Sequence, residues 1–168
     1  LNAGVTPALI SYVCSKLISA SPIVVPLGMN IKPYFSYLDV EEQISEPAKC
    51  LTTGQSMPID RVLYLYKKGI EIGKSTRQPI LIAESVPGGT TTAQAVMEAF
   101  GLNVSNLVGS SLYKAPRELR RKVVQKGLIN ANFKTDFDSF DVVASLGDPF
   151  QAFSMGLLIG ARLAKQPV

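Results

Sequence analysis

Pro79-Ile80-Leu81-Ile82-Ala83-Glu84-Ser85-Val86-Pro87-Gly88-Gly89-Thr90-Thr91-Thr92-Ala93 is the stretch from which the fold of this chain is predicted. An apolar run is followed by a carboxylate, a Pro-Gly-Gly turn and three threonines, which predicts a buried strand, a tight turn and the start of a helix. The first N–H groups of a helix lack helical partners and the helix dipole favours negative charge there, so the turn is a candidate anion site. Gly88 and Gly89 carry no side chain that would keep a phosphate away from the backbone.

Short apolar runs alternate with helical patterns along the rest of the chain. Residues 23–25 and 104–108 are predicted as further strands. Helices are predicted over about 7–19, 56–74, 91–100, 116–130 and 149–164, with another through 144 that starts at Asp136 or Asp138. Strands that alternate with helices are typical of an α/β fold, here a Rossmann-like parallel sheet with helices on both faces. We expect residues 1–168 to form a single domain, cut at both ends from a longer chain.

Two other segments carry structural expectations. The first helix starts at Thr6-Pro7 and has an apolar face, on which Cys14 is expected to be a core residue; its members are Leu9, Ile10, Val13, Leu17 and Ile18. The irregular stretch 32–54 is long for a loop, so it is expected to be either functional or packed against a missing portion of the protein.

Composition excludes several classes of function. The chain has 168 residues, of which 46% are hydrophobic and 18% charged, and no apolar run reaches the roughly 20 residues that cross a bilayer. Its two cysteines lack CxxC spacing, which indicates a reducing compartment and a cytoplasmic protein. The absence of histidine excludes imidazole metal ligands, imidazole general bases and Ser-His-Asp triads from this segment. We expect no membrane association, no metal and no cofactor.

The net charge of +4 comes largely from one predicted helix, whose cations are Arg117, Arg120, Arg121, Lys122 and Lys126. These residues are expected to form a solvated face. Because no aromatic residues that could stack on bases are interleaved with them, we expect no nucleic-acid binding.

The candidate site leaves alternatives open. Glu84 either contacts a ligand or caps the following turn by accepting its N–H groups. The Gly88–Thr91 turn either binds phosphate or is a plain turn, and it is not a Walker A loop because no Gly-Lys-Ser/Thr follows. The hydroxyls of the second loop, Gly109-Ser110-Ser111, either bind a ligand or cap a turn, and Asp148 is expected to be a helix N-cap.

These residues resemble a known family. Residues 84–91 are similar to the Glu-x-Gly-Ile-Gly-Asn-Thr-Thr segment of nicotinate-nucleotide–dimethylbenzimidazole phosphoribosyltransferases, and closer to the Glu-Ser-x-Pro-Gly-Gly-Thr-Thr-Thr segment of its archaeal and cyanobacterial branch. The similarity continues through 107–109, 119–124, 142–149 and 156–161. Residues 1–83 resemble mainly the closer branch, at 7–10 and 31–33.

This resemblance implies transfer of ribose 5-phosphate from nicotinate mononucleotide to a benzimidazole-type base, with release of nicotinate, in cobalamin lower-ligand biosynthesis. It implies a homodimer, with Glu84 in the active site and Lys122 as the cation for the phosphate. The other substrate-binding residues that it implies are Ser85, Pro87, Gly88, Gly89, Thr90, Thr91, Gly109 and Ser110. The general base of the family is a second glutamate, expected beyond Val168, so these residues alone are expected to be inactive. The alternatives are a non-catalytic nucleotide- or phosphate-binding module and a structural subunit.

Overall fold

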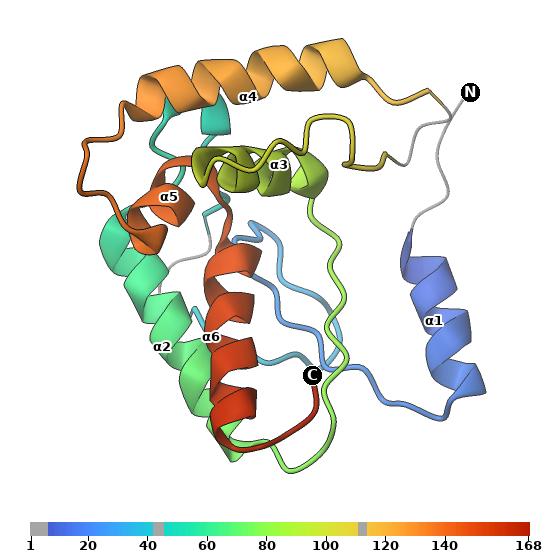
Figure 1. Cartoon of the computed structure of the whole chain (residues 1–168). Coiled ribbons are helices and arrows are strands. Elements are labelled where there is room, and N and C mark those ends of the chain that lie inside the picture. Colours follow the sequence, from blue (N-terminus) through green and yellow to red (C-terminus); the bar gives the residue numbers. More distant parts are fainter. Residues whose placement is uncertain (1–6, 42–45, 111–113) are drawn as a thin grey trace.

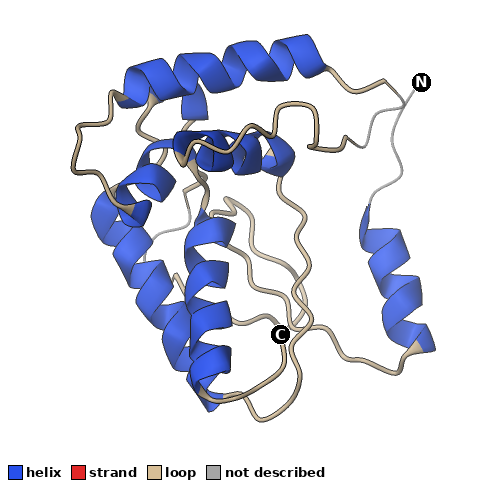
Figure 2. Ribbon diagram, viewed as in Figure 1, coloured by secondary structure: helices blue, strands red, loops and turns tan. Residues whose placement is uncertain are grey.

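The computed structural model describes residues 7–41, 46–110 and 114–168, and the regular structure within these ranges is helical (Figure 2). The elements are α1 (Pro7–Leu17), the 3₁₀ turn η1 (Leu51–Thr53), α2 (Ile59–Ser75), α3 (Gly89–Ala99), α4 (Arg117–Ala131), α5 (Ser139–Leu146) and α6 (Pro149–Leu163) (Figure 1). No helix in these ranges is both long enough and apolar enough to span a membrane.

The predicted parallel sheet is wrong for the described residues, which contain no strand. The runs 23–25, 80–83 and 104–108 lack regular structure, and large side chains in them face solvent, with Ile23 76%, Leu81 87% and Leu107 79% exposed. A strand is stabilised by a ladder of backbone hydrogen bonds and by burial of at least one face. Here Ile80 N donates a single bond of 3.0 Å to Pro167 O, and no neighbouring described residue extends it into a ladder.

Two parallel helices, α2 and α6, form the body of the fold (Figure 1). Gly69 of α2 packs against the α6 backbone, since a Cβ placed on it would lie 2.6 Å from Leu157 N. Gly73 makes the equivalent approach one turn further on, at 2.6 Å from Ala161 N, so the two helices run in the same direction. From the α6 side, Gly156 and Gly160 approach α2 carbonyls in the same way. The absence of side chains at these four positions lets the helices come into backbone contact.

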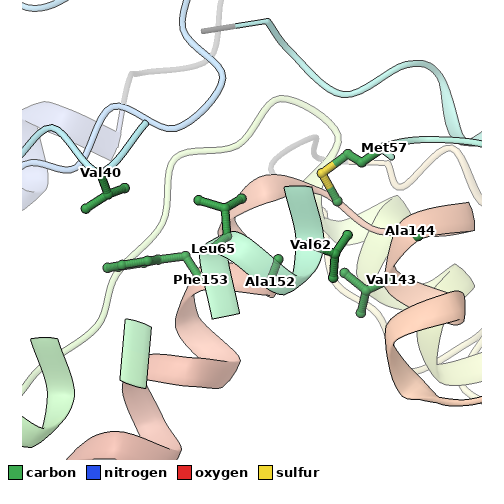
Figure 3. Close-up of a cluster of buried hydrophobic side chains, with 8 residues drawn as sticks. All are labelled: Val40, Met57, Val62, Leu65, Val143, Ala144, Ala152 and Phe153. Carbon is green, nitrogen blue, oxygen red and sulfur yellow. The ribbon is translucent and has the colours of Figure 1, made fainter. Parts of the chain in front are cut away.

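The main core lies at the first turns of this helix pair. Buried side chains from α2, α5, α6 and the preceding loop meet there; they are Val40, Met57, Val62, Leu65, Val143, Ala144, Ala152 and Phe153 (Figure 3). Removing such apolar surface from water stabilises the fold by roughly 25 cal/mol per Å². A second cluster of Leu51, Ala95, Val124 and Leu146 joins η1, α3, α4 and α5. The two clusters together attach α3, which carries the candidate site, to the helix pair.

The expected burial of α1 is wrong. This helix stands apart from the other helices (Figure 1), and Leu9, Ile10, Val13 and Leu17 are between 48% and 79% exposed. Cys14, expected in the core, is also exposed. An apolar stripe is buried only where another surface covers it, and no such surface lies against α1 among the described residues. Thr6, the predicted N-cap, lies outside the described residues.

The long segment before α2 is anchored by a buried ion pair. Arg61 of α2 donates to both oxygens of Glu41, at 2.6 and 3.0 Å, and both side chains are almost completely buried. The N–H of Gly28 donates to the same carboxylate at 3.0 Å. The segment therefore packs on α2 through Glu41 and Val40, a contact within this chain that the sequence did not predict.

Of the two residues that the sequence offered as the start of α5, Asp136 and Asp138, the structure selects the second. Asp138 caps α5, because its carboxylate accepts from Phe140 N at 2.8 Å and from Asp141 N at 3.0 Å. Gly101 follows α3 at φ +79°, as a C-terminal glycine does.

Candidate functional site

The site is built on the first turn of α3. Gly88 precedes the helix with φ +78°, a left-handed conformation that favours glycine, and Gly89 is the first helical residue. Gly89 N donates to Val86 O at 2.9 Å, which closes the turn. No partner is found within the described chain for the N–H groups of Gly88 and Thr90, and a Cβ on Gly88 would meet nothing within 4 Å. The turn therefore presents free donors beside open space, as an anion site requires.

Glu84 lies against this turn. Its Oε2 accepts a hydrogen bond of 3.0 Å from Val86 N. A Cβ on Gly89 would lie 2.9 Å from Oε2 and 3.1 Å from Oε1, so the carboxylate covers the Cα of Gly89. Glu84 thus caps the turn in this structure. Because the residue is exposed, its side chain can turn toward a ligand without leaving a buried pocket.

A contact that the sequence did not predict ties this turn to α6. Thr92 Oγ1 donates to Asp148 Oδ2 at 2.6 Å and also lies 3.0 Å from Gly89 O. The prediction that Asp148 is an N-cap is confirmed, because its Oδ1 accepts from Gln151 N at 3.0 Å. The only signal for this contact in the sequence is that the second oxygen of an N-cap carboxylate can accept a hydrogen bond and that the threonines of the turn can donate one.

The second predicted loop is held by α4. Arg120 donates through Nη1 to Val108 O at 3.0 Å and through Nη2 to Gly109 O at 2.8 Å. Arg120 is only 5% exposed, so its assignment to a solvated face was wrong, because the loop covers it. The solvated-face prediction is confirmed for Arg121, which is exposed and pairs with Glu118. Ser111 lies outside the described residues.

The remaining predicted site residues are exposed or half-buried around these two anchors. Ser85, Pro87 and Thr90 are exposed and Thr91 is half-buried in the turn, and Lys122 is exposed on α4. Helices α3 and α4 pack together and begin at the same end of the molecule (Figure 1). The contacts thus form two groups, one around Glu84, Gly89 and Thr92 and one around Arg120. No hydrogen bond between described residues joins Lys122 to either group.

An open hollow of about 410 Å³ lies elsewhere, at the C-terminal ends of α2 and α6. Its lining includes Lys74, Arg77 and Gln166, none of which is a predicted site residue. The guanidinium of Arg77 donates to Lys74 O at 2.8 Å and to Thr76 O at 3.2 Å. Arg77 therefore satisfies carbonyls at the end of α2, which accounts for a cation at this position.

Comparisons with known proteins place the chain in a family. Residues 7–168 match the model of a family described as phosphoribosyltransferase. All 168 residues align at 78% identity with 44% of a UPF0284 protein of Prochlorococcus marinus strain MIT 9312, and at 45% with 42% of one from strain MIT 9313. A UPF0284 protein of Gloeothece citriformis is 34% identical over 166 residues, which are 96% of this chain and 44% of the relative. The chain thus spans less than half the length of these relatives. The family resemblance inferred from the sequence is confirmed, and the chain belongs to the phosphoribosyltransferase family.

Proposed function

We propose that the start of α3 binds the phosphate of nicotinate mononucleotide, and that the full-length protein transfers its ribose 5-phosphate to a benzimidazole-type base. Nicotinate is released, and the product belongs to cobalamin lower-ligand biosynthesis. The observation that supports this most is the α3 turn, where the unpartnered N–H groups of Gly88 and Thr90 border open space in a phosphoribosyltransferase chain.

Phosphate binding follows from the physics of this turn. The positive end of the α3 dipole and free backbone donors favour a dianion, and glycine at 88 and 89 allows it to approach the backbone. Thr90 and Thr91 add hydroxyl donors at the same turn. Lys122 supplies the cation in this proposal. Its flexible ammonium acts as a point charge that reaches the phosphate from α4.

The transfer itself exchanges one bond at the anomeric carbon for another. The bond from C1′ to the pyridinium nitrogen breaks, and its electron pair returns to the nitrogen of the departing nicotinate. A ring nitrogen of the base forms the new bond to C1′, and the base loses its N–H proton. Positive charge develops on the ribose during this exchange, and the carboxylate of Glu84 stabilises it.

The proton of the incoming base requires an acceptor. Glu84 is engaged with the developing charge on the ribose in this proposal. The acceptor is therefore assigned to the second glutamate, which the family resemblance places beyond Val168. The same resemblance leads to the proposal of a cytoplasmic homodimer, which sedimentation and cell fractionation would test.

The proposal is tested by nicotinate release. Full-length protein is mixed with nicotinate mononucleotide and a series of benzimidazoles, and free nicotinate is measured by chromatography. Release that depends on the added base, and that falls strongly in Glu84→Gln, supports the transfer. If nucleotide binds but no base in the series causes release, the transferase proposal is wrong and the protein is a nucleotide-binding module.

A further inference from the structure

Arg120 is a buried cation whose burial needs an explanation. Its neighbour Arg121 is exposed, whereas Arg120 is 5% exposed in the first turn of α4. Taking a guanidinium out of water costs several kcal/mol unless hydrogen bonds and an opposite charge compensate for it. Two of its N–H groups are satisfied by Val108 O and Gly109 O. Arg120 therefore has two hydrogen bonds within the fold, and the other form of compensation would be an opposite charge near it.

Arg61 provides a matched comparison within the same chain. Both arginines are almost completely buried, but Arg61 forms a two-point ion pair with Glu41. The described residues offer no carboxylate within ion-pair distance of Arg120. The charge of Arg61 is thus neutralised inside the fold, while that of Arg120 is not. An anion near the loop that Arg120 holds would be stabilised by this charge.

The two hydrogen bonds also fix the loop itself. The two terminal nitrogens of a guanidinium lie in one plane, so bonds of 3.0 and 2.8 Å to successive carbonyls set the orientation of both peptide groups. Those peptides lead directly into Gly109 and Ser110. Residues 100–110, which follow α3, return toward the end of the molecule where α3 and α4 begin (Figure 1), and Gly88 directly precedes α3. Lysine could not reproduce this arrangement, because its single ammonium has no rigid fork.

We infer that Arg120 is a positioning residue for the phosphate end of the nucleotide. It holds the 108–110 segment in the conformation that receives the phosphate, and its unneutralised charge favours the dianion there. The inference rests on the proposed function, because it takes nicotinate mononucleotide as the ligand. It adds a residue with no assigned role and separates it from its neighbours Arg121 and Lys122.

The test compares three variants by calorimetric titration. Arg120→Met removes both the charge and the hydrogen bonds, Arg120→Lys keeps only the charge, and Arg121→Met is the control because Arg121 is exposed. Each protein is titrated with nicotinate mononucleotide and with nicotinate riboside, which lacks the phosphate. Circular dichroism and the thermal midpoint confirm that each variant is folded, and amide hydrogen exchange at residues 109 and 110 reports on the loop.

The expected result is specific to the phosphate. Affinity for the mononucleotide should fall by at least about tenfold in Arg120→Met, because the variant loses hydrogen bonds made by a charged group. Affinity for the riboside should be unchanged. Arg120→Lys should recover part of the loss, and Arg121→Met should bind as the wild type does. Amide exchange at 109 and 110 should be faster in both Arg120 variants.

Three outcomes would overturn the inference, and they are distinguishable. If the wild type binds no mononucleotide, the proposed function fails and the inference fails with it. If the wild type binds and Arg120→Met binds equally well, the inference alone is wrong. If Arg120→Met is folded but loses affinity for both ligands in the same proportion, Arg120 has a general structural role and does not position the phosphate. If Arg120→Met does not fold, Arg120→Lys is used in its place, and the ratio of its affinities for the mononucleotide and the riboside is compared with that of the wild type.

Discussion

Thr92 on α3 and Asp148 at the start of α6 share a hydrogen bond of 2.6 Å. Asp148 is 4% exposed, so this bond satisfies an oxygen that water does not reach. The bond links the start of α3 to the start of α6, and so to the closely packed α2–α6 pair. Asp148, which caps α6, thus also holds the candidate anion site in place through Thr92.

Thr92→Val should destabilise the protein. Valine has the shape of threonine, but it leaves Asp148 Oδ2 buried without its donor, and an unsatisfied buried polar group costs about 1–3 kcal/mol, more if charged. The free energy of unfolding from urea denaturation measures this loss. Thr92→Ser retains the hydroxyl and is the control. Equal stability of Thr92→Val and the wild type would show that this hydrogen bond contributes nothing.

Gly156→Ala should destabilise the α2–α6 pair. The new methyl group would collide with the Tyr66 carbonyl, which is backbone and cannot move aside alone. In an open helix the same change gains about 1 kcal/mol, whereas overpacking costs about 1–3 kcal/mol or more, so the net effect is a loss. Gly109→Ala is the control, because its methyl group meets nothing within 4 Å. A higher thermal midpoint for Gly156→Ala would contradict the close helix contact.

The two kinds of ion pair should respond differently to loss of one charge. Glu41→Gln leaves the Arg61 guanidinium buried without its counter-charge, and breaking a buried pair costs about 3–5 kcal/mol. Glu118→Gln removes an exposed pair on α4 and should change the free energy of unfolding by at most about 1 kcal/mol. Urea denaturation of both variants is the measurement. Similar losses in the two would mean that Glu41 does not anchor the long segment to α2.

Cys50 should be alkylated faster in the wild type than in a variant that lacks the Thr52 hydroxyl. The side-chain hydrogen bond between the Cys50 thiol and the Thr52 hydroxyl, at 3.2 Å, lowers the pKa of this exposed thiol, and a backbone hydrogen bond with Thr52 contributes in the same direction. The thiolate is the reacting form, so a lower pKa raises the rate with iodoacetamide near neutral pH. Thr52→Val should slow alkylation of Cys50 and shift its rate profile to higher pH. Alkylation of Cys14, also exposed, is the internal control. An unchanged pH profile for Cys50 would show that the Thr52 hydroxyl does not lower the pKa of this thiol.

The sequence predicted the features that depend on neighbours along the chain. The start of α6 at Asp148-Pro149 and the cap of α5 at Asp138 are local patterns of capping residues, and both helices begin there. The sequence failed where a partner distant in the chain decides the outcome. Residues 80–83 have the composition of a strand, but a strand also needs a neighbouring strand to pair with, and these residues have no regular structure.

The candidate site shows the same division. The turn at Gly88-Gly89 was recognisable because glycine pairs before a helical pattern have a local meaning. The burial of Arg120 could not be recognised from the sequence, because its spacing matches that of the exposed cations and the residues that cover it, 108–109, lie in a separate loop. The contact between α2 and α6 had a readable signal: each helix carries a Gly-x-x-x-Gly motif, and the two motifs face each other.

We propose that the start of α3 binds the phosphate of nicotinate mononucleotide, and one pair of glycine substitutions tests this proposal. Gly88 and Gly101 lie at opposite ends of α3, with φ of +78° and +79°, and neither has an atom within 4 Å of an added Cβ. Gly88→Asp and Gly101→Asp therefore introduce the same charge and the same backbone strain, but only the first places a carboxylate at the anion site.

The decisive measurement is calorimetric titration of both variants and the wild type with nicotinate mononucleotide. The wild type and Gly101→Asp should bind with similar affinity, and binding to Gly88→Asp should be lost. Equal binding by Gly88→Asp and Gly101→Asp, or no binding by the wild type, would contradict the proposal.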